Sequence, residues 1–81
     1  MLQINETDNF KRIKNKLDKS YLTRLEKIIR KIIENPEIGK PMQYERIGTR
    51  EVYITSLRVS YAYDKAKEAL TFLDIYHKDE Q

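Results

Sequence analysis

The sequence has no cysteine, two glycines and one histidine, and these low counts exclude several kinds of chemistry. Without cysteine the chain forms neither a disulfide nor a thiolate zinc site. Gly39 and Gly48 are too far apart to form a phosphate-cradling loop or a dinucleotide-binding fingerprint. The lone His77 cannot supply the usual imidazole ligand sets. We therefore expect neither a metal nor a cofactor.

The sequence also lacks a long apolar run, a repeat, a low-complexity tract and a linker. Its longest apolar stretches are far shorter than the roughly 18 to 20 residues that a membrane span needs, and it starts with a polar segment. We therefore expect a single soluble domain over residues 1–81, located in the cytoplasm and without membrane contact.

Charge is unevenly distributed along the chain, although the net charge is only +3. Residues 1–50 hold 12 basic and 7 acidic side chains, a balance of +5, whereas residues 51–81 hold 4 and 6, a balance of −2. A basic first half is compatible with a polyanionic partner such as RNA or DNA, and equally with ordinary solvated helix faces.

Two amphipathic helices are predicted in the first half, after a short alternating strand at residues 1–4. Capping residues precede an apolar series at helical spacing, which predicts a helix over about 8–17. A second capping signal at residues 18–20 precedes a wide apolar stripe. This second helix should end near Asn35, because Pro36 disfavours helical geometry in the residue before it.

Beyond Gly48 the apolar period changes from helical to alternating, which predicts strands over 50–54, 57–63 and 70–76. The segment NPEIGKP, residues 35–41, is predicted as a turn-forming loop. The economical architecture is α+β: an N-terminal helical hairpin packed on one face of a small antiparallel sheet, in the order β-α-α-β-β-β. Each layer then covers the apolar face of the other.

The last predicted strand is apolar on both sides. Alternation puts Phe72, Asp74 and Tyr76 on one side and Leu73 and Ile75 on the other, which predicts a central strand.

Arg58 lies in the third predicted strand, SLRVSYAYD, on the face that the helices leave uncovered. Alternation places it between the small Ser60 and Ala62. One interpretation is an ion pair with Asp74 or Glu51, worth roughly 0 to 1 kcal/mol if exposed. The other is a guanidinium fork that binds a phosphate through paired oxygens.

The order of the motifs resembles the RelE toxins of type II toxin–antitoxin pairs, within the RelE/ParE superfamily, and the small archaeal members in particular. The motifs are ENPEIGKP at the end of the helical hairpin, then GTREVYI, LRVSYAYD and the terminal FLDIYHKDE. The most specific are the Asn-Pro after the second helix, the Arg-Val-x-Tyr core of the third strand, and the His-basic-x-acidic ending. The resemblance covers nearly the whole chain.

This resemblance implies an enzyme, a ribosome-dependent endoribonuclease that cuts messenger RNA in the decoding site and inhibits translation. It also implies silencing by a RelB-like antitoxin in a toxin–antitoxin hetero-oligomer. RelE-like enzymes use no metal, because the 2′-hydroxyl of the RNA attacks the adjacent phosphorus.

The resemblance also implies roles for particular residues. Arg58 would stabilise the transition state, His77 would transfer a proton, Lys78 would supply positive charge, and Tyr76 would orient a base by stacking.

Contacts to the RNA backbone would come from Lys40, Arg46 and Arg50, and Tyr53 is a weaker candidate for stacking on a base.

The sequence also departs from the family pattern. It has no tyrosine beyond Lys78, and Glu51 and Tyr53 occupy the region where some members carry second-strand lysines. The general base is therefore not identified. Two alternatives stay open: a ParE-like inhibitor of DNA gyrase, and a noncatalytic binding domain of the same fold.

Overall fold

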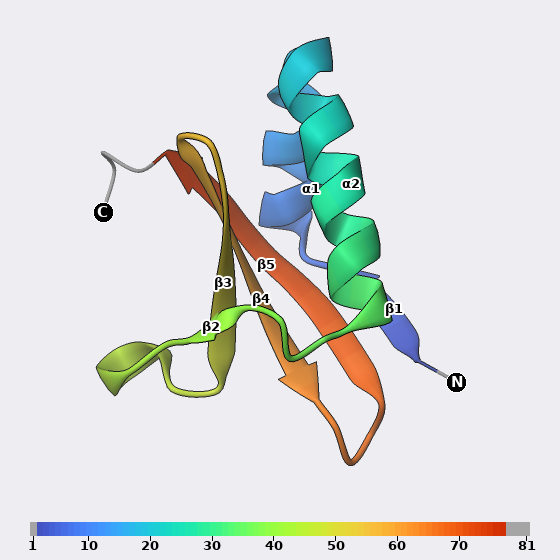
Figure 1. Ribbon diagram of the computed structural model, residues 1–81, viewed down its shortest axis with the longest axis vertical. Helices are drawn as coiled ribbons and strands as arrows, with labels where there is room; N and C mark the ends of the chain where they lie inside the picture. The colour runs from blue at the N-terminus through green and yellow to red at the C-terminus, as the bar shows by residue number, and fades with distance from the viewer. Residues whose placement is uncertain (1, 78–81) are drawn as a thin grey trace.

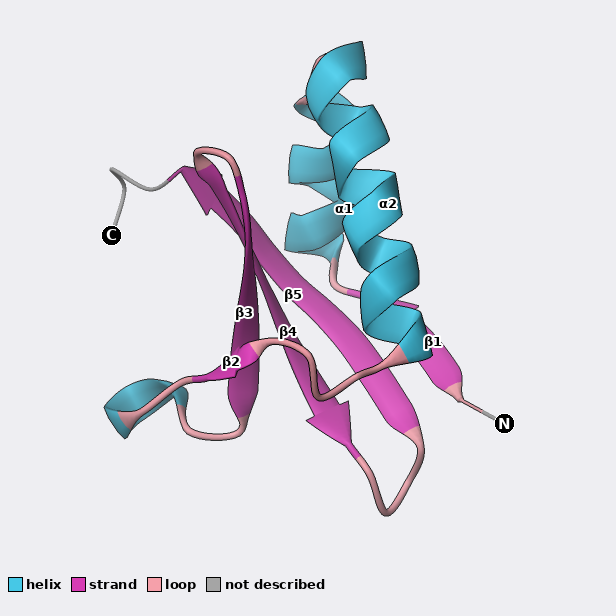
Figure 2. Cartoon of the chain, in the orientation of Figure 1, coloured by secondary structure: helices cyan, strands magenta, loops and turns pink. Residues whose placement is uncertain are grey.

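The computed structural model describes residues 2–77, so the predicted role of Lys78 lies outside the described residues. Two helices stand beside a twisted sheet (Figures 1 and 2). The elements in chain order are β1 Gln3–Glu6, α1 Asp8–Lys16, α2 Lys19–Glu34, β2 Lys40–Pro41, the 3₁₀ helix η1 Tyr44–Arg46, β3 Thr49–Ile54, β4 Leu57–Asp64 and β5 Ala69–His77. Within residues 2–77, no helix is long and apolar enough to cross a membrane.

Side-chain caps set the starts of both helices, which confirms the predicted boundaries to within about a residue. The Thr7 hydroxyl accepts a hydrogen bond from the Phe10 amide at the start of α1, and the Asp18 carboxylate accepts one from the Tyr21 amide at the start of α2. Helix α2 ends at Glu34, immediately before Asn35 and Pro36, as predicted.

The sheet has the strand order β1-β5-β4-β3-β2 and is mixed, which corrects the prediction of a purely antiparallel sheet. Strands β2 to β5 are antiparallel, whereas β1 pairs with β5 in parallel. A parallel pair needs a long connection, and here nearly the whole chain separates the two strands. Strand β5 lies between β1 and β4, so its predicted internal position is confirmed.

A bulge in β5 corrects the predicted alternation of that strand. Tyr61 pairs with Phe72 but Ser60 pairs with Asp74, so Leu73 is an extra residue in the β4–β5 ladder. Phe72 is therefore buried on the side of the helices, whereas Asp74 faces the other side. The Thr7 hydroxyl donates to the Leu73 carbonyl at 2.9 Å, which ties the start of α1 to the bulge.

The core lies between the helices and one face of β3, β4 and β5. Its fully buried apolar side chains come from both layers and include Phe10, Leu25 and Ile32 from the helices, and Val59, Tyr61 and Phe72 from the strands. Phe10 stacks on Phe72 with ring centroids 5.3 Å apart. The helices lie on this side of the sheet (Figure 1), so the opposite face of β3 to β5 remains available for a site, apart from Asp74, whose carboxylate accepts a hydrogen bond from Asn9 of α1.

Candidate functional site

The uncovered face of β3, β4 and β5 collects the side chains that the register places opposite one another. Tyr53 and Tyr76 both pair with Arg58, and Glu51 and Asp74 both pair with Ser60. Paired residues of antiparallel strands point to the same side of a sheet. We call this surface the open face, and its members are Glu51, Tyr53, Arg58, Ser60, Asp74 and Tyr76.

Glu51 is the centre of the open face and is only 2% exposed. Its Oε2 atom accepts a hydrogen bond from Arg46 Nη1 at 2.9 Å and another from the Tyr76 hydroxyl. Arg58 Nη1 lies 3.9 Å from its Oε1 atom, which accepts no hydrogen bond from the described residues. A buried carboxylate needs such partners, because burying a charge without them is costly.

Arg58 lies over an aromatic ring. Its guanidinium carbon is 4.3 Å from the centroid of the Tyr53 ring, a cation–π contact, and its side chain is 19% exposed. The predicted ion pair with Glu51 is present at 3.9 Å, whereas the Asp74 carboxylate accepts hydrogen bonds from the Asn9 amide group and the Ile75 backbone. Stacking and charge pairing together hold the arginine in one place.

Arg46 and Tyr76 complete the cluster. Arg46 reaches back from η1 and donates to the Tyr76 hydroxyl at 2.9 Å. This hydrogen bond is the main cause of the raised pKa of Arg46. Burial, followed by the hydrogen bond to Glu51, raises the pKa of Tyr76, so its hydroxyl stays protonated over the neutral range.

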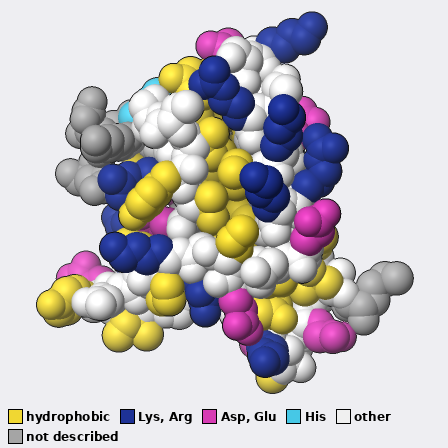
Figure 3. Space-filling model, viewed as in Figure 1, with side chains coloured by type: hydrophobic (Ala, Val, Ile, Leu, Met, Phe, Trp, Pro, Cys, Tyr) yellow, Lys and Arg dark blue, Asp and Glu magenta, His cyan; other side chains and the backbone are white. Residues whose placement is uncertain are grey.

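The cluster carries a net positive charge, since two guanidinium groups surround one carboxylate. Figure 3 shows Lys and Arg side chains along the outer surface of the helices and a further group on the side of the molecule where β3 lies. The Asp74 carboxylate on the same face brings the formal charge of the open face, counted with Arg46, to zero, so the two arginine forks and not a net charge are what suit phosphate oxygens here.

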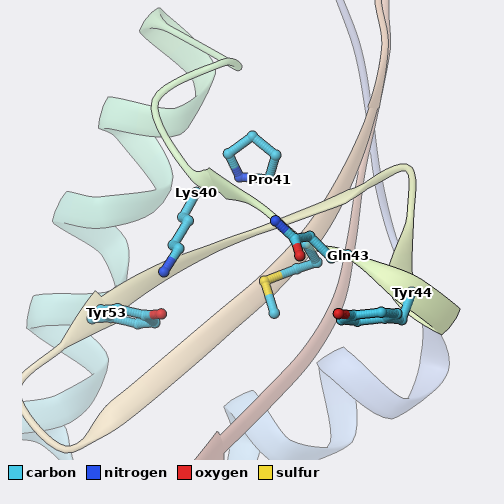
Figure 4. A pocket seen from close by; sticks show the side chains of 6 residues that line it. Lys40, Pro41, Gln43, Tyr44 and Tyr53 are labelled. Carbon is cyan, nitrogen blue, oxygen red and sulfur yellow. The ribbon is translucent and has the colours of Figure 1, made fainter.

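Lys40 and Tyr53 meet in a surface hollow beside the cluster (Figure 4). The hollow has a volume of about 310 Å³ and is lined by Lys40, Pro41, Met42, Gln43, Tyr44 and Tyr53. We call it the Tyr44–Tyr53 hollow.

Two residues proposed from the sequence lie away from the cluster. Arg50 pairs with the buried Tyr61 on the side of the helices, and its Nη1 atom donates to the carbonyls of Glu37 and Gly39 at 2.9 and 2.8 Å. His77 pairs with the buried Leu57 on that same side.

The His77 ring packs edge-on against Tyr21 of α2, with ring centroids 6.4 Å apart. The structure therefore brings together Arg58, Tyr76, Arg46 and Tyr53, with Lys40 next to them, but neither Arg50 nor His77.

Glu51 is the residue that sequence reasoning undervalued, because it appeared there as an ion-pair partner for Arg58 and as a departure from the family pattern, and not as a member of the site. A signal was available. The two-residue turn at 55–56 sets Ile54 opposite Leu57, which puts Glu51 on the same face as Arg58. Its burial could not be read from the sequence, since it depends on Arg46 reaching back from η1.

The fold and the site define a small α+β protein with an arginine-rich, uncovered sheet face. A family model described as the ParE toxin of the type II toxin–antitoxin system parDE matches residues 7–81. The chain belongs to this family and is a toxin of a type II toxin–antitoxin system, within the RelE/ParE superfamily. The resemblance drawn from the sequence is therefore confirmed at the level of the superfamily.

Solved structures share the fold over nearly their whole length. The toxin–antitoxin complex RelBE2 from Mycobacterium tuberculosis matches at 22% identity, 94% of this chain, 96% of that chain and a TM-score of 0.83. The YoeB/ParE toxin from Agrobacterium tumefaciens is 13% identical, and the match covers 94% of this chain and 98% of that chain with a TM-score of 0.82. The archaeal RelE–RelB complex from Pyrococcus horikoshii is 13% identical, and the match covers 99% of this chain and 98% of that chain with a TM-score of 0.76. Comparison with curated protein sequences gives no match.

Proposed function

We propose that the protein is a ribosome-dependent endoribonuclease that cuts messenger RNA and thereby inhibits translation. One observation carries this proposal: Arg46 and Arg58 are both held beside the buried Glu51 on a face of the sheet that no helix covers. Two fixed guanidinium groups over one carboxylate suit an RNA phosphate whose negative charge grows during cleavage.

The proposed reaction is an internal transfer at phosphorus. The 2′-oxygen of the RNA forms a bond to the adjacent phosphorus, and the bond from phosphorus to the 5′-oxygen of the next nucleotide breaks. The leaving 5′-oxygen takes up one proton from solvent, which balances the proton lost by the 2′-hydroxyl. The products are a cyclic phosphate and a free 5′-hydroxyl, with no net uptake of water. Arg58 would stabilise the extra charge on the phosphate oxygens, which is the role of an oxyanion stabiliser.

The reaction also needs a path for the proton of the 2′-hydroxyl. The Tyr76 hydroxyl already donates to Glu51, so it can receive the 2′-proton while its own proton moves to the carboxylate. Arg46 donates to both groups and would hold them in line. This path makes Glu51 a positioning and proton-accepting residue that does not itself reach the RNA.

A RelB-like antitoxin is the proposed partner of the toxin. The structures of RelBE2 and of the archaeal RelE–RelB pair are toxin–antitoxin complexes of the same fold. An antitoxin segment that is acidic in part would cover the basic surface and block the open face. Mixing the purified pair should give a stable hetero-oligomer on a sizing column, and the absence of a complex at micromolar concentration would refute the partnership.

Primer extension on messenger RNA in programmed ribosomes tests the activity. Wild type, Arg58→Ala and the control Arg30→Ala are compared, with ribosome-free RNA alongside, since Arg30 is an exposed arginine on α2. The proposal predicts cuts at the decoding site that require both the ribosome and Arg58. Intact RNA with folded wild type would refute it.

The family description favours one alternative, a ParE-like inhibitor of DNA gyrase. A supercoiling assay with purified gyrase separates the two functions. If wild type and Arg58→Ala inhibit gyrase equally, the toxin acts on gyrase by a route that does not use the proposed cleavage site. A toxin inactive in both assays would be a noncatalytic binding domain.

A further inference from the structure

We propose that the Tyr44–Tyr53 hollow is a binding site for one nucleobase of the RNA. The inference rests on the proposed function, because it takes the RNA phosphate to lie at Arg58. It adds a subsite that holds a base next to that phosphate.

The hollow has the size and lining of a small-ring site. Its volume of about 310 Å³ is at the lower end of the range for small-molecule pockets. Figure 4 shows the hydroxyl ends of Tyr44 and Tyr53 pointing toward one another across it. Gln43 lies between the two rings in Figure 4, and Met42 also lines the hollow, so apolar surface and an amide group with both donors and acceptors face the same space.

Tyr53 connects the hollow to the phosphate cluster. Its ring carries the Arg58 guanidinium at 4.3 Å and also lines the hollow, and its residue is 49% exposed. A base in the hollow would therefore be separated from a phosphate at Arg58 by the width of one side chain. Lys40 adds a positive charge on the same wall, where the sugar–phosphate backbone would enter.

Tyr44 is presented to solvent in an unusual way. Its backbone φ is +59°, in the left-handed region that tyrosine rarely adopts, and the residue is 85% exposed. An exposed aromatic ring held on such a backbone is a feature of binding sites rather than of packing. Aromatic rings bind bases of any sequence by stacking, so the hollow would take a base without requiring a particular one.

A methionine methyl signal provides a direct test, because the chain has two methionines and Met42 lines the hollow. The full chain is labelled with methyl-¹³C methionine, and a Met42→Leu variant assigns the signal. The probe is a 2′-O-methyl RNA trinucleotide, which cannot be cleaved, and the control ligand is the same molecule with its central base removed.

The base-containing trinucleotide should shift the Met42 methyl signal in a saturable way, and the abasic one should not. Tyr44→Ala should weaken binding roughly tenfold, since stacking on one base is lost. Ile47→Ala should leave the affinity unchanged, because Ile47 is another 77% exposed side chain of this loop but does not line the hollow. No shift, an equal shift with the abasic ligand, or equal affinities of the two variants would overturn the inference.

Failure of this inference can be told apart from failure of the proposed function. Ribosome-dependent cuts by wild type without a base-dependent Met42 shift would remove the subsite and keep the nuclease. A base-dependent shift without any cleavage would keep the base site and remove the nuclease. A shift produced by a protein partner alone would assign the hollow to the antitoxin and overturn the inference.

Discussion

The two faces of strands β3 to β5 use the same kinds of polar side chain for different purposes. On the covered face, Arg50 and the Tyr61 hydroxyl bind backbone carbonyls of the loop after α2. On the open face, Arg46 and Arg58 surround a carboxylate. Carbonyl partners belong to the fold and cannot be exchanged without moving the chain. A side-chain carboxylate can share its arginines with an incoming phosphate, so only the open face is suited to ligand binding.

Replacing one arginine on each face by alanine tests this comparison most directly. Arg58→Ala should lower cleavage by roughly two to three orders of magnitude, because one oxyanion stabiliser is lost. It should also lower the melting temperature, because the buried Glu51 loses one of its charge partners, but the protein should stay folded. Arg50→Ala should cost about 1 to 2 kcal/mol of stability and leave the cleavage rate of the folded protein unchanged, because two charge-assisted hydrogen bonds to the loop are lost. Single-turnover cleavage and thermal unfolding are measured on both. Similar cleavage by the two variants would contradict the division between faces.

Removing the charge of Glu51 tests whether the open face acts as one unit. Glu51→Gln should lower cleavage roughly tenfold to a hundredfold, because Arg46, Arg58 and Tyr76 lose their common partner and shift from the productive geometry. The exposed Glu45→Gln is the matched control. The pH dependence of single-turnover cleavage is measured for both variants. Wild-type rates and an unchanged pH profile in Glu51→Gln would exclude the proposed proton path.

Tyr61→Phe tests the covered face. The Tyr61 hydroxyl accepts from the Gly39 amide at 2.9 Å and donates to the Pro36 carbonyl at 2.8 Å, so the variant leaves two backbone groups unpaired. The free energy of unfolding in urea should fall by about 1 to 3 kcal/mol. Cleavage per folded molecule should be unchanged. A loss of cleavage larger than the loss of folded protein would show that the loop after α2 contributes to the site.

Alkaline pH gives a second readout of the same tyrosine. Burial raises the pKa of Tyr61 in the folded state, whereas the unfolded chain ionises near pH 10. The unfolded state therefore loses its proton first, and the stabilising contribution, complete below pH 10, is lost as the pH rises through the folded-state pKa. Between these two values the free energy of unfolding should decrease more steeply for wild type than for Tyr61→Phe. Parallel curves would refute this.

His77→Gln should have the smallest effect. The ring lies against Tyr21 on the covered side, so cleavage should stay within about twofold of wild type, whereas loss of a proton-transfer group typically costs a hundredfold or more. Single-turnover cleavage between pH 6 and 8 decides between these outcomes. A hundredfold loss would restore the role that the resemblance implied for His77.

Much of the fold was predictable because local signals agreed with one another. The capping residues Thr7 and Asp18 predicted the starts of the two helices, and Pro36 predicted the end of the second. The alternation of β4 gave the correct faces over its whole length, since Leu57, Val59 and Tyr61 are buried. In β5 the same reasoning failed beyond Phe72, because a bulge depends on pairing with β4 and on the hydrogen bond from Thr7, which is distant in the chain.

The candidate site was predictable only in part, for the same reason. Arg58, Tyr76 and Tyr53 lie on one face because strand alternation and a two-residue turn require it. Arg50 and His77 looked equally suitable by residue type, yet strand parity and the surrounding loop and helix place them on the covered side.

By itself, the sequence determined the helical hairpin, the strands and the face on which Arg58 lies, because capping and apolar period are properties of neighbouring residues. The burial of Glu51 under Arg46 and Tyr76, the parallel pairing of β1 with β5, and the hollow beside Tyr53 were decided only by the tertiary structure. Each of these features joins segments that are separate in the chain. No local pattern encodes them, since contacts between distant segments form only when the whole sheet is assembled.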